Sequence, residues 1–465
     1  MLGALQLIEH ELLLFAAFWF VVGALDEMAV DLSYLWLRAT GAIARPRISE
    51  YEENAPLHGP IAVFVPAWQE AEVIGHMIRH TLGVWPQSQL TLFVGCYRND
   101  PASIEAAIKG AGGDPRLRIV INDADGPTTK ADCLNRLYRA MERDEERQSM
   151  RYAGVVLHDA EDMVHPAALV TIDRALRRAA FVQLPVRPEP QAASRWIAGH
   201  YADEFAEAHG KSLVVRDALG AAIPAAGVGC GFARSALEEL AEARRENGRN
   251  ANGPFAEDCL TEDYELGLLI SRGGARGRFL RLKDRYGDLV ATRAYFPATL
   301  DEAVRQKTRW IHGIAFQSWD RLGWGGSWLD RWMTVRDRRG PFAAIVLAAA
   351  YLLLTIEGLL ALARLAGWQS PYETPVLLKT ILIVSFAAFA WRALWRFCFT
   401  ANEYGLREGV LAVLRIPLAN IVTIMAGRRA LSAYVRSLRG QAPAWDKTHH
   451  GYHPTVPPPA RTATP

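Results

Sequence analysis

One apolar segment constrains this chain more than any other feature of its sequence. Phe342–Ala363 reads FAAIVLAAAYLLLTIEGLLALA, 22 residues in which Glu357 carries the one charge. At 1.5 Å per residue a helix of this length covers about 33 Å, whereas the hydrocarbon core of a bilayer is roughly 30 Å thick. We therefore predict that the segment forms a transmembrane helix.

Two further apolar segments follow it. Val376–Trp391 carries one charge, Lys379, close enough to its end for the amine to reach the headgroups, so we predict a second span. Three residues that disfavour lipid interrupt the next segment, Gly409–Ala426, namely Arg415, Pro417 and Asn420. That segment fits an interfacial or re-entrant helix as well as a span. We predict a membrane region over residues 341–440, with two spans plus an interfacial or third helix.

The N-terminal apolar run, Leu12–Leu25, is only 14 residues long. A signal peptide would have a basic segment before it and a small-residue cleavage site after it, and the sequence has neither. We therefore predict an N-terminal transmembrane helix within residues 1–40. Three acids follow on one side of that helix, Asp26, Glu27 and Asp31. They either face other helices or headgroups, or they mark where the helix leaves the membrane near Asp26.

Arginines predict the orientation. They follow the first helix and precede the second, at Arg38, Arg45, Arg47, Arg331, Arg336, Arg338 and Arg339, and more follow the last apolar segment, at Arg428, Arg429, Arg436 and Arg439. Because basic residues concentrate on the cytoplasmic side, residues 38–341 and the C-terminal end are expected there. This favours three spans and one interfacial helix. Residues 441–465 are Pro-rich and are predicted to be disordered.

The block between the membrane segments, residues 55–330, has the pattern of an α/β domain. Four apolar runs, Ile61–Val65, Leu90–Cys96, Leu117–Ile121 and Gly154–His158, are each followed by a helical pattern, Gln69–Leu82, Pro101–Lys109, Lys130–Glu142 and Pro166–Arg178. Strands that are apolar throughout and alternate with helices predict a mostly parallel sheet covered on both faces. In such a sheet, ligands bind beyond the carboxyl ends of the strands.

Composition and missing motifs exclude several classes of protein. The 52 basic and 50 acidic side chains give a net charge of +2, too little for a nucleic-acid binder that relies on bulk charge. The five cysteines are scattered without a C-x-x-C pair, which excludes a disulfide scaffold and argues against a zinc site. Neither GxGxxG after the first strand nor a P-loop is present, so dinucleotide and P-loop binding lose support.

Acidic residues follow the predicted strands at the ligand-binding edge. They are Glu70 after the first strand, Asp100 after the second, and Asp159, Glu161 and Asp162 after the fourth. The last group has two explanations. These acids either lie near the start of a helix, where its dipole favours negative charge, or supply oxygen ligands that hold Mg²⁺ or Mn²⁺ against a diphosphate.

Two later motifs complete the candidate site. Thr261, Glu262 and Asp263 open a predicted helix that ends at Gly273, and helix capping alone would explain them. Leu300–Trp319 is predicted to form an amphipathic helix. One of its faces brings together an amide, a guanidinium and an indole with two further residues, in the order Gln306, Arg309, Trp310, Gly313 and Gln317. Interfacial anchoring would explain the arginine and the tryptophan, but not the whole set.

The order of these motifs resembles the D, D, D, QxxRW signature of membrane-embedded family 2 glycosyltransferases, the group of cellulose, hyaluronan and related polysaccharide synthases. The resemblance spans roughly residues 60–320. It implies a GT-A-like, Rossmann-like domain inserted between transmembrane helices. The usual DxD motif is here Asp159-Ala-Glu161 followed by Asp162, so either Glu161 or Asp162 could be the second metal ligand.

The resemblance implies a role for each candidate residue. The donor nucleotide would be bound by Glu70, Asp100, Lys130 and Asp159, with Asp100 accepting from its base. A divalent ion, Mg²⁺ or Mn²⁺, would be held by Asp159 with Glu161 or Asp162. The general base would be Asp263, with Glu262 beside it orienting the site or exchanging roles. The acceptor and the departing diphosphate would lie against Gln306, Arg309 and Trp310.

These roles imply an inverting, metal-dependent transfer of a sugar from a nucleotide diphosphate, expected to be a UDP-sugar, to a growing surface or secreted polysaccharide. By the same resemblance we expect a multi-pass protein of the bacterial inner (plasma) membrane with a cytoplasmic catalytic domain, membrane lipids around it, an export partner in the envelope and no nucleic-acid partner. Two alternatives stay open: a non-processive transferase onto a polyprenyl-phosphate lipid, and an inactive membrane-anchored sensor of nucleotides or polysaccharide.

Overall fold

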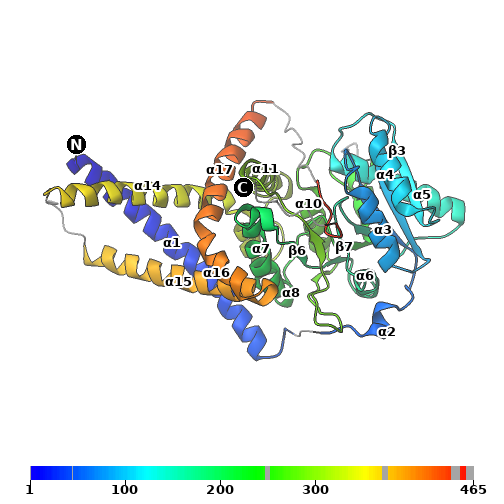
Figure 1. Cartoon of the computed structure of the whole chain (residues 1–465), viewed down its shortest axis with the longest axis horizontal. Coiled ribbons are helices and arrows are strands. Elements are labelled where there is room, and N and C mark those ends of the chain that lie inside the picture. The colour runs from blue at the N-terminus through cyan, green and yellow to red at the C-terminus, as the bar shows by residue number, and fades with distance from the viewer. Residues whose placement is uncertain (1, 44–45, 247–251, 369–374, 441–450, 457–465) are drawn as a thin grey trace, which may run out of the picture.

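The domain between the membrane segments is built on a seven-stranded mixed sheet (Figure 1). Its strands and those of a smaller second sheet are β1 Ile61–Pro66, β2 Leu90–Tyr97, β3 Leu117–Asn122, β4 Gly154–Leu157, β5 Phe181–Gln183, β6 Val186–Pro188, β7 Cys230–Ala233, β8 Gly277–Phe279 and β9 Thr292–Ala294. The computed structural model describes residues 2–43, 46–246, 252–368, 375–440 and 451–456. In these residues the main sheet has the order β3-β2-β1-β4-β7-β5-β8, and β6 pairs with β9.

The four strands that the sequence predicts are present and parallel. β1 pairs in parallel with β2 and with β4, and β2 pairs in parallel with β3. β7 lies antiparallel between β4 and β5, and β8 continues the sheet in parallel with β5. The predicted α/β class with a mostly parallel sheet is therefore confirmed.

Helices cover both faces of this sheet. Those of the domain are α2 Glu50–Glu53, α3 Ile74–Val84, α4 Pro101–Ala111, α5 Lys130–Gln148, α6 Ala168–Leu176, η1 Ala192–Ser194, α7 Ile197–Glu207, η2 Ala208–Ser212, α8 Leu213–Ala218, α9 Arg234–Glu246, α10 Glu262–Arg272, α11 Leu300–Ile311, η3 His312–Gln317, α12 Ser318–Leu322 and α13 Trp328–Arg338. Ile61, Val63 and Val65 pack against α3 and α6, whereas Ala62 and Phe64 pack with α5 and α10. Alternate residues of a strand point to opposite faces, so a sheet buried on both sides requires a run that is apolar throughout.

The helix after β1 begins later than predicted. The sequence predicts a helix over Gln69–Leu82, whereas α3 begins at Ile74. Gln69 has a φ of 53°, in the left-handed region that an α-helix excludes, and its N–H donates to Asp100 Oδ2 at 2.6 Å. Residues 67–73 therefore form a turn at the carboxyl end of β1.

Three helices of the described residues are long and apolar enough to cross a membrane. They are α1 Leu2–Ala39, in which the candidate span starts at Leu5, α14 Gly340–Leu365 and α15 Val376–Tyr404. All three extend away from the sheet on the same side of the domain (Figure 1). The predicted arrangement, an α/β domain placed between membrane-spanning helices, is confirmed by their length, composition and position in the chain.

The last apolar segment forms two helices, α16 Leu406–Leu414 and α17 Ile416–Ser437, which bend by 51°. The buried guanidinium of Arg415, at the bend, donates to both carboxylate oxygens of Asp203 on α7 at 2.9 Å. The bend is thus fixed against the domain. In Figure 1, α17 runs across the end of α14 and packs on α11. The bent pair fits a broken span or a re-entrant segment, so an interfacial or third helix stays a prediction.

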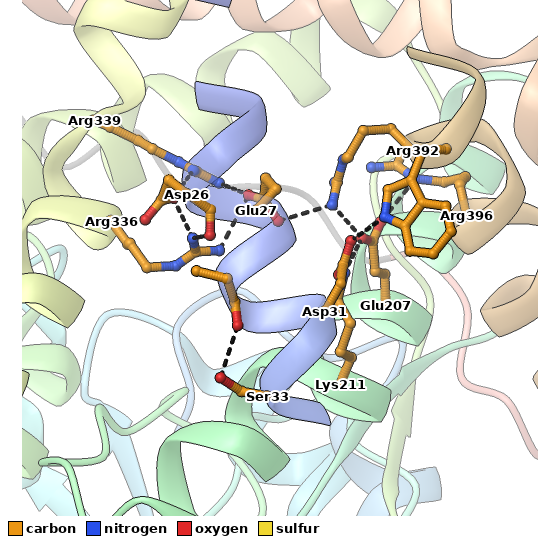
Figure 2. A network of polar contacts seen from close by, with 12 residues as sticks. Asp26, Glu27, Asp31, Ser33, Glu207, Lys211, Arg336, Arg339, Arg392 and Arg396 are labelled. Carbon is orange, nitrogen blue, oxygen red and sulfur yellow. Dashed lines mark hydrogen bonds and ion pairs between the residues drawn. The ribbon is translucent and has the colours of Figure 1, made fainter. Parts of the chain in front are cut away.

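The acids of α1 face other helices, as one of the two sequence interpretations predicts (Figure 2). Asp26 pairs with Arg336, near the end of α13, and at 2.9 Å with Arg339. Glu27 pairs with the same two arginines and, at 2.8 Å, with Arg392 of α15. These ion pairs join α1 to α15 and to the junction between α13 and α14.

Asp31 and Lys211 bring the domain into the same network (Figure 2). Both side chains are 0% exposed, and Lys211, on η2, pairs with Asp31 and, at 2.9 Å, with Glu207. Although burial opposes ionisation, the charges of Arg392, Arg396 and Lys211 lower the pKa of Glu207 to about 2. The cluster therefore stays charged and connects the domain to α1 and α15.

Part of the C-terminal region differs from its prediction. Disorder was expected over residues 441–465, but residues 451–456 pack against the domain. His453 is buried, with Nε2 3.0 Å from the carbonyl oxygen of Asp162 and its ring stacked on that of His76 at 6.3 Å. The prediction rested on a Pro-rich composition with few apolar residues. Composition does not show that one side chain, the His453 ring, is buried against the domain. The other residues of 441–465 lie outside the described part of the chain.

Lys211→Met should lower the free energy of unfolding by about 3 kcal/mol, because it leaves Asp31 and Glu207 buried with one cation fewer. Chemical unfolding of the purified chain in detergent, followed by tryptophan fluorescence, measures the change. The matched control is Lys109→Met, at an exposed position of α4, which should not move the unfolding midpoint. Equal midpoints for the two variants would contradict a stabilising role for the buried network.

Candidate active site

A cavity of about 480 Å³ opens at the carboxyl ends of β1 and β4. Ten of the eleven residues predicted to form the site line it: Glu70, Lys130, Asp159, Glu161, Asp162, Glu262, Asp263, Gln306, Arg309 and Trp310. The eleventh, Asp100, does not. Side chains that are far apart in the sequence thus meet in one cavity.

Asp100 is buried beside the turn that follows β1. One of its carboxylate oxygens accepts from the N–H of Ser103 and caps α4, and the other accepts from the N–H of Gln69 at 2.6 Å. Asp100 therefore holds the turn that carries Trp68 and Glu70 into the cavity. A hydrogen bond from Asp100 to a nucleotide base stays a prediction.

The acids after β4 differ in exposure. Asp159 and Glu161 are partly exposed to the cavity, whereas Asp162 is buried. Oδ2 of Asp162 accepts from the N–H of Asp159 at 3.0 Å and lies 2.8 Å from Nδ1 of His158. Burial raises the pKa of Asp162, against the opposing hydrogen bond from His158. One oxygen of Asp162 is therefore already engaged in holding the loop.

Lys130 lies between the two groups of acids. Its Nζ is 2.5 Å from Asp159 Oδ1. Although burial opposes a charged amine, the charges of Asp159, Glu262 and Asp263 hold the pKa of Lys130 above its usual value. The first residue of α5 thus places a permanent positive charge in the middle of the cavity.

The carboxylates of the cavity fit a divalent metal that is also bound by a ligand. Within the residues described, no group of three or more His, Cys, Asp or Glu side chains is placed to hold a metal ion. Asp159 and Glu161 offer two carboxylates, which is what Mg²⁺ commonly takes from a protein when substrate phosphates supply further oxygens. A site of this kind is completed only by the substrate.

Glu262 and Asp263 occupy the first turn of α10, and the helix ends at Gly273 as predicted. The N–H of Tyr264 donates to Asp263 Oδ1 at 2.7 Å. Burial and then the charge of Asp263 raise the pKa of Glu262 to about 8, and burial also raises the pKa of Asp263. A raised pKa makes a carboxylate a stronger base at neutral pH.

Gly227 lies directly against Asp263. Its φ is 78°, and a Cβ built on it would be 2.2 Å from Asp263 Oδ2 and 3.5 Å from Lys130 Nζ. The position therefore requires glycine for backbone conformation and for space. Gln183 holds this loop, since its Oε1 accepts from the N–H of Ala226 at 2.8 Å. Sequence reasoning missed both Gly227 and Gln183.

Gln306, Arg309 and Trp310 line the cavity from one face of α11, as the helical spacing predicts. The indole of Trp310 packs edge-on against Tyr201, with ring centroids 6.0 Å apart. Oε1 of Gln306 is buried and accepts no hydrogen bond from any residue that the structure describes. Leaving such an atom unsatisfied costs about 1–3 kcal/mol.

The segment after α11 forms a π-helix, η3, which was not predicted. It contacts the residues at the start of the motif Thr261-Glu262-Asp263. The side-chain carbonyl of Gln317 accepts from the N–H of Leu260 at 2.9 Å, and a Cβ on Gly313 would lie 2.4 Å from Thr261 Oγ1. π-Helical turns often occur at functional sites. The signal in the sequence was the place of Gly313 and Gln317 on the same helical face as Gln306.

Comparisons with known proteins agree with this fold and site. Residues 58–313 match the model of a family described as "Glycosyltransferase like family 2". The chain is 33% identical over 461 residues to bacteriophage adsorption protein B of Escherichia coli strain K12 and to bacteriophage N4 adsorption protein B of Escherichia coli O157:H7. Each alignment covers 93% of this chain and 60% of the relative, so the chain spans about 60% of the length of these curated relatives.

A similar solved structure is the mannosyltransferase PcManGT from Pyrobaculum calidifontis in complex with GDP-Man and Mn²⁺. It is 17% identical, with a TM-score of 0.50, and the match covers 86% of this chain and 99% of that one. At this identity the likeness concerns the fold, and it agrees with the GT-A-like sheet.

Gly227→Ala should destabilise the protein more than Gly220→Ala. The two glycines have φ values of 78° and 76°, so both substitutions carry a similar backbone strain of about 1–2 kcal/mol. Nothing lies within 4 Å of a Cβ on Gly220, whereas one on Gly227 meets Asp263. Adding Asp263→Ala to Gly227→Ala should therefore recover about 1 kcal/mol or more beyond additivity. Chemical unfolding of the four variants measures this coupling, and strictly additive effects would contradict the contact.

Proposed function

The chain belongs to the glycosyltransferase-like family 2, and from that membership we propose that it moves a sugar from a nucleotide diphosphate to a growing polysaccharide, with inversion at the anomeric carbon. It is a glycosyltransferase that uses a nucleotide sugar. The observation that carries the proposal is one cavity that is lined by a carboxylate and cation pair, Asp159 and Lys130, and by the base candidate Asp263.

Asp263 is the proposed general base. It takes the proton of an acceptor hydroxyl, whose oxygen forms a bond to the anomeric carbon of the donor sugar while the bond from that carbon to the phosphate oxygen breaks. The proton then rests on Asp263, and the electron pair of the broken bond leaves with the nucleoside diphosphate. A single displacement of this kind inverts the anomeric centre and needs no carboxylate nucleophile.

Asp159 and Glu161 are the proposed ligands of Mg²⁺ or Mn²⁺, because both are partly exposed to the cavity whereas Asp162 is buried. When bound, such an ion neutralises the charge of a leaving diphosphate. Lys130, beside Asp159, supplies a second positive charge for the same diphosphate. The Mn²⁺ in the similar mannosyltransferase supports a divalent metal here.

The donor nucleotide is proposed to lie over the turn after β1. Trp68 and Tyr97 meet edge-on there with ring centroids 5.2 Å apart, and both line the cavity with Glu70. Their aromatic surface suits a nucleobase. The resemblance to polysaccharide synthases favours a UDP-sugar, whereas the similar mannosyltransferase holds GDP-Man, so both donors are tested below.

The acceptor is proposed to approach from the membrane side, along α11. Val422 and Ala426 of α17 pack with the residues that flank Trp310 on α11. On another side of α17, a Cβ on Gly427 would lie 2.5 Å from that of Ala344 on α14. The acceptor end of the cavity is thus in packing contact with the membrane-proximal helices, which supports a polysaccharide or a lipid-linked acceptor.

We place the protein in the bacterial inner membrane with its domain in the cytoplasm. Support comes from the arginines that flank α1 and α14, since basic residues favour the cytoplasmic side. The relatives are named for bacteriophage adsorption, which supports a product or an export partner that reaches the cell surface.

The second candidate is non-processive transfer of one sugar onto a polyprenyl phosphate. It is favoured by the small membrane region, because three span-length helices in the described residues are few for a conduit through which a polymer leaves. The two candidates share donor, metal and base, and they differ in the size of the product.

A donor panel tests both candidates. Membranes that contain the full chain are incubated with labelled UDP- and GDP-sugars, with Mn²⁺ and with chelator instead. Metal-dependent label in a product much larger than a lipid-linked monosaccharide supports polymer synthesis. One sugar on a lipid supports the second candidate. No turnover of any donor would contradict both and leave an inactive sensor.

Asp263→Asn should lower kcat about 10²- to 10⁴-fold while leaving donor affinity nearly unchanged, because it removes the base and keeps the shape of the side chain. Release of nucleoside diphosphate measures kcat, and equilibrium dialysis of labelled donor measures affinity. The control is Asp301→Asn, at an exposed position in the first turn of α11. Near wild-type turnover by Asp263→Asn would show that another group is the base.

Transfer should accelerate as the pH rises through roughly 7 to 9. The carboxyl pair must lose its proton before Asp263 can act, and the pKa of Glu262 is raised to about 8. Glu262→Gln removes a negative charge beside Asp263, so the pKa of Asp263 falls and the midpoint of the pH profile should move to lower pH. An unchanged midpoint in this variant would contradict coupling between the two carboxyls.

A further inference from the structure

A second cavity, of about 230 Å³, lies apart from the catalytic one. Its walls come from the C-terminal halves of α1 and α15, from η2 and α8, and from the segment between β8 and β9. None of its described lining residues also lines the catalytic cavity. The proposed transfer reaction gives this second cavity no role.

Aromatic rings form one wall of the second cavity. Trp395 and Phe399 of α15 stack with centroids 5.6 Å apart, and Tyr34 of α1 meets both edge-on, at 5.9 and 5.6 Å. Leucine and isoleucine side chains complete an apolar surface. Hydrocarbon chains can bind such a wall.

The charged groups of this cavity are all positive. Arg281 and Lys283 line it, and no acidic residue does among those described. Arg281 is neutralised by an ion pair with Glu403. Lys283 has no ion-pair partner in the described parts of the chain. The cavity therefore offers one uncompensated ammonium beside an apolar wall, which suits an anionic amphiphile.

The position of the cavity matches the headgroup layer of a bilayer. The apolar part of α15 ends at Trp391, and tryptophan is enriched at membrane interfaces. Trp395 and Phe399 follow one and two turns later, which is roughly 6 and 12 Å along the helix. On α1, Leu35 and Trp36 next to Tyr34 are exposed, the latter to 61%, as expected where lipid rather than water surrounds a helix.

We propose that this second cavity binds an anionic phospholipid, with its phosphate at Lys283 and the start of its acyl chains against the ring of Phe399. The inference stands independently of the proposed catalytic function. A lipid bound there would lie next to the buried network that joins the domain to α1. Gly210 of η2 lines the cavity, and its neighbour Lys211 forms the buried ion pair with Asp31.

The chain contains its own reporter for this site. Cys398 lines the cavity and is exposed, whereas the other four cysteines, Cys96, Cys133, Cys230 and Cys259, are buried. A maleimide should therefore alkylate Cys398 selectively, and an occupant of the cavity should slow that reaction. Mass spectrometry of the intact protein gives the rate.

The experiment compares an anionic lipid with a zwitterionic lipid of the same chain length and with a phosphate compound that has no acyl chain. The full chain in detergent is alkylated alone, with short-chain phosphatidylglycerol, with phosphatidylcholine of the same chain length, and with glycerol 3-phosphate. Phosphatidylglycerol should slow alkylation about fourfold once roughly three-quarters of the sites are filled, and the other two compounds should not. Equal protection by phosphatidylcholine, or full protection by glycerol 3-phosphate, would overturn the proposal.

Two lysine variants locate the effect. Lys283→Gln should alkylate at the normal rate without lipid, which shows an intact fold, and should lose the protection by phosphatidylglycerol. Lys109→Gln, on the exposed face of α4, should keep it. Retained protection in Lys283→Gln would overturn the assignment of the phosphate position, and equal loss in both variants would show that protection depends on overall charge rather than on this cavity.

Discussion

The buried charges of α1 are the constraint on which the rest of the structure depends. Removing a carboxylate from water costs several kcal/mol unless a cation and hydrogen bonds replace its hydration. Asp31 and Glu27 meet this requirement only if α13, α15 and η2 all approach α1. The observed placement of the membrane helices on the sheet domain pairs both of these acids, and in it α11 packs on α17.

In the candidate active site, the charge of the buried acids is only partly balanced by cations. Lys130 is shared among Asp159, Glu262 and Asp263, so three acids surround one cation. Burial and this excess of negative charge raise the pKa of Glu262 to about 8. A metal ion and a proton are the two positive charges that the proposed reaction brings to the site, and the residual charge explains why both would be bound there.

Local patterns in the sequence predicted what depends on local burial. The IAVFV run demands two covered faces, and the spacing of Gln306, Arg309 and Trp310 places them on one face of any helix. What could not be predicted depends on partners far away in the chain. The N–H of Gln69, after β1, donates to Asp100, after β2. Gln317 in the π-helix accepts from Leu260, and His453 contacts Asp162, 291 residues away in the sequence. No periodicity encodes such contacts.

The position of α17 sets a limit on what can reach the catalytic cavity. α17 packs both on α14 and on α11, and helix axes in such contacts lie roughly 8–10 Å apart. If the acceptor is lipid-linked, as proposed, its lipid stays in the bilayer and its sugars must extend past α17 to reach Trp310, so an acceptor with too few sugars would not reach the cavity.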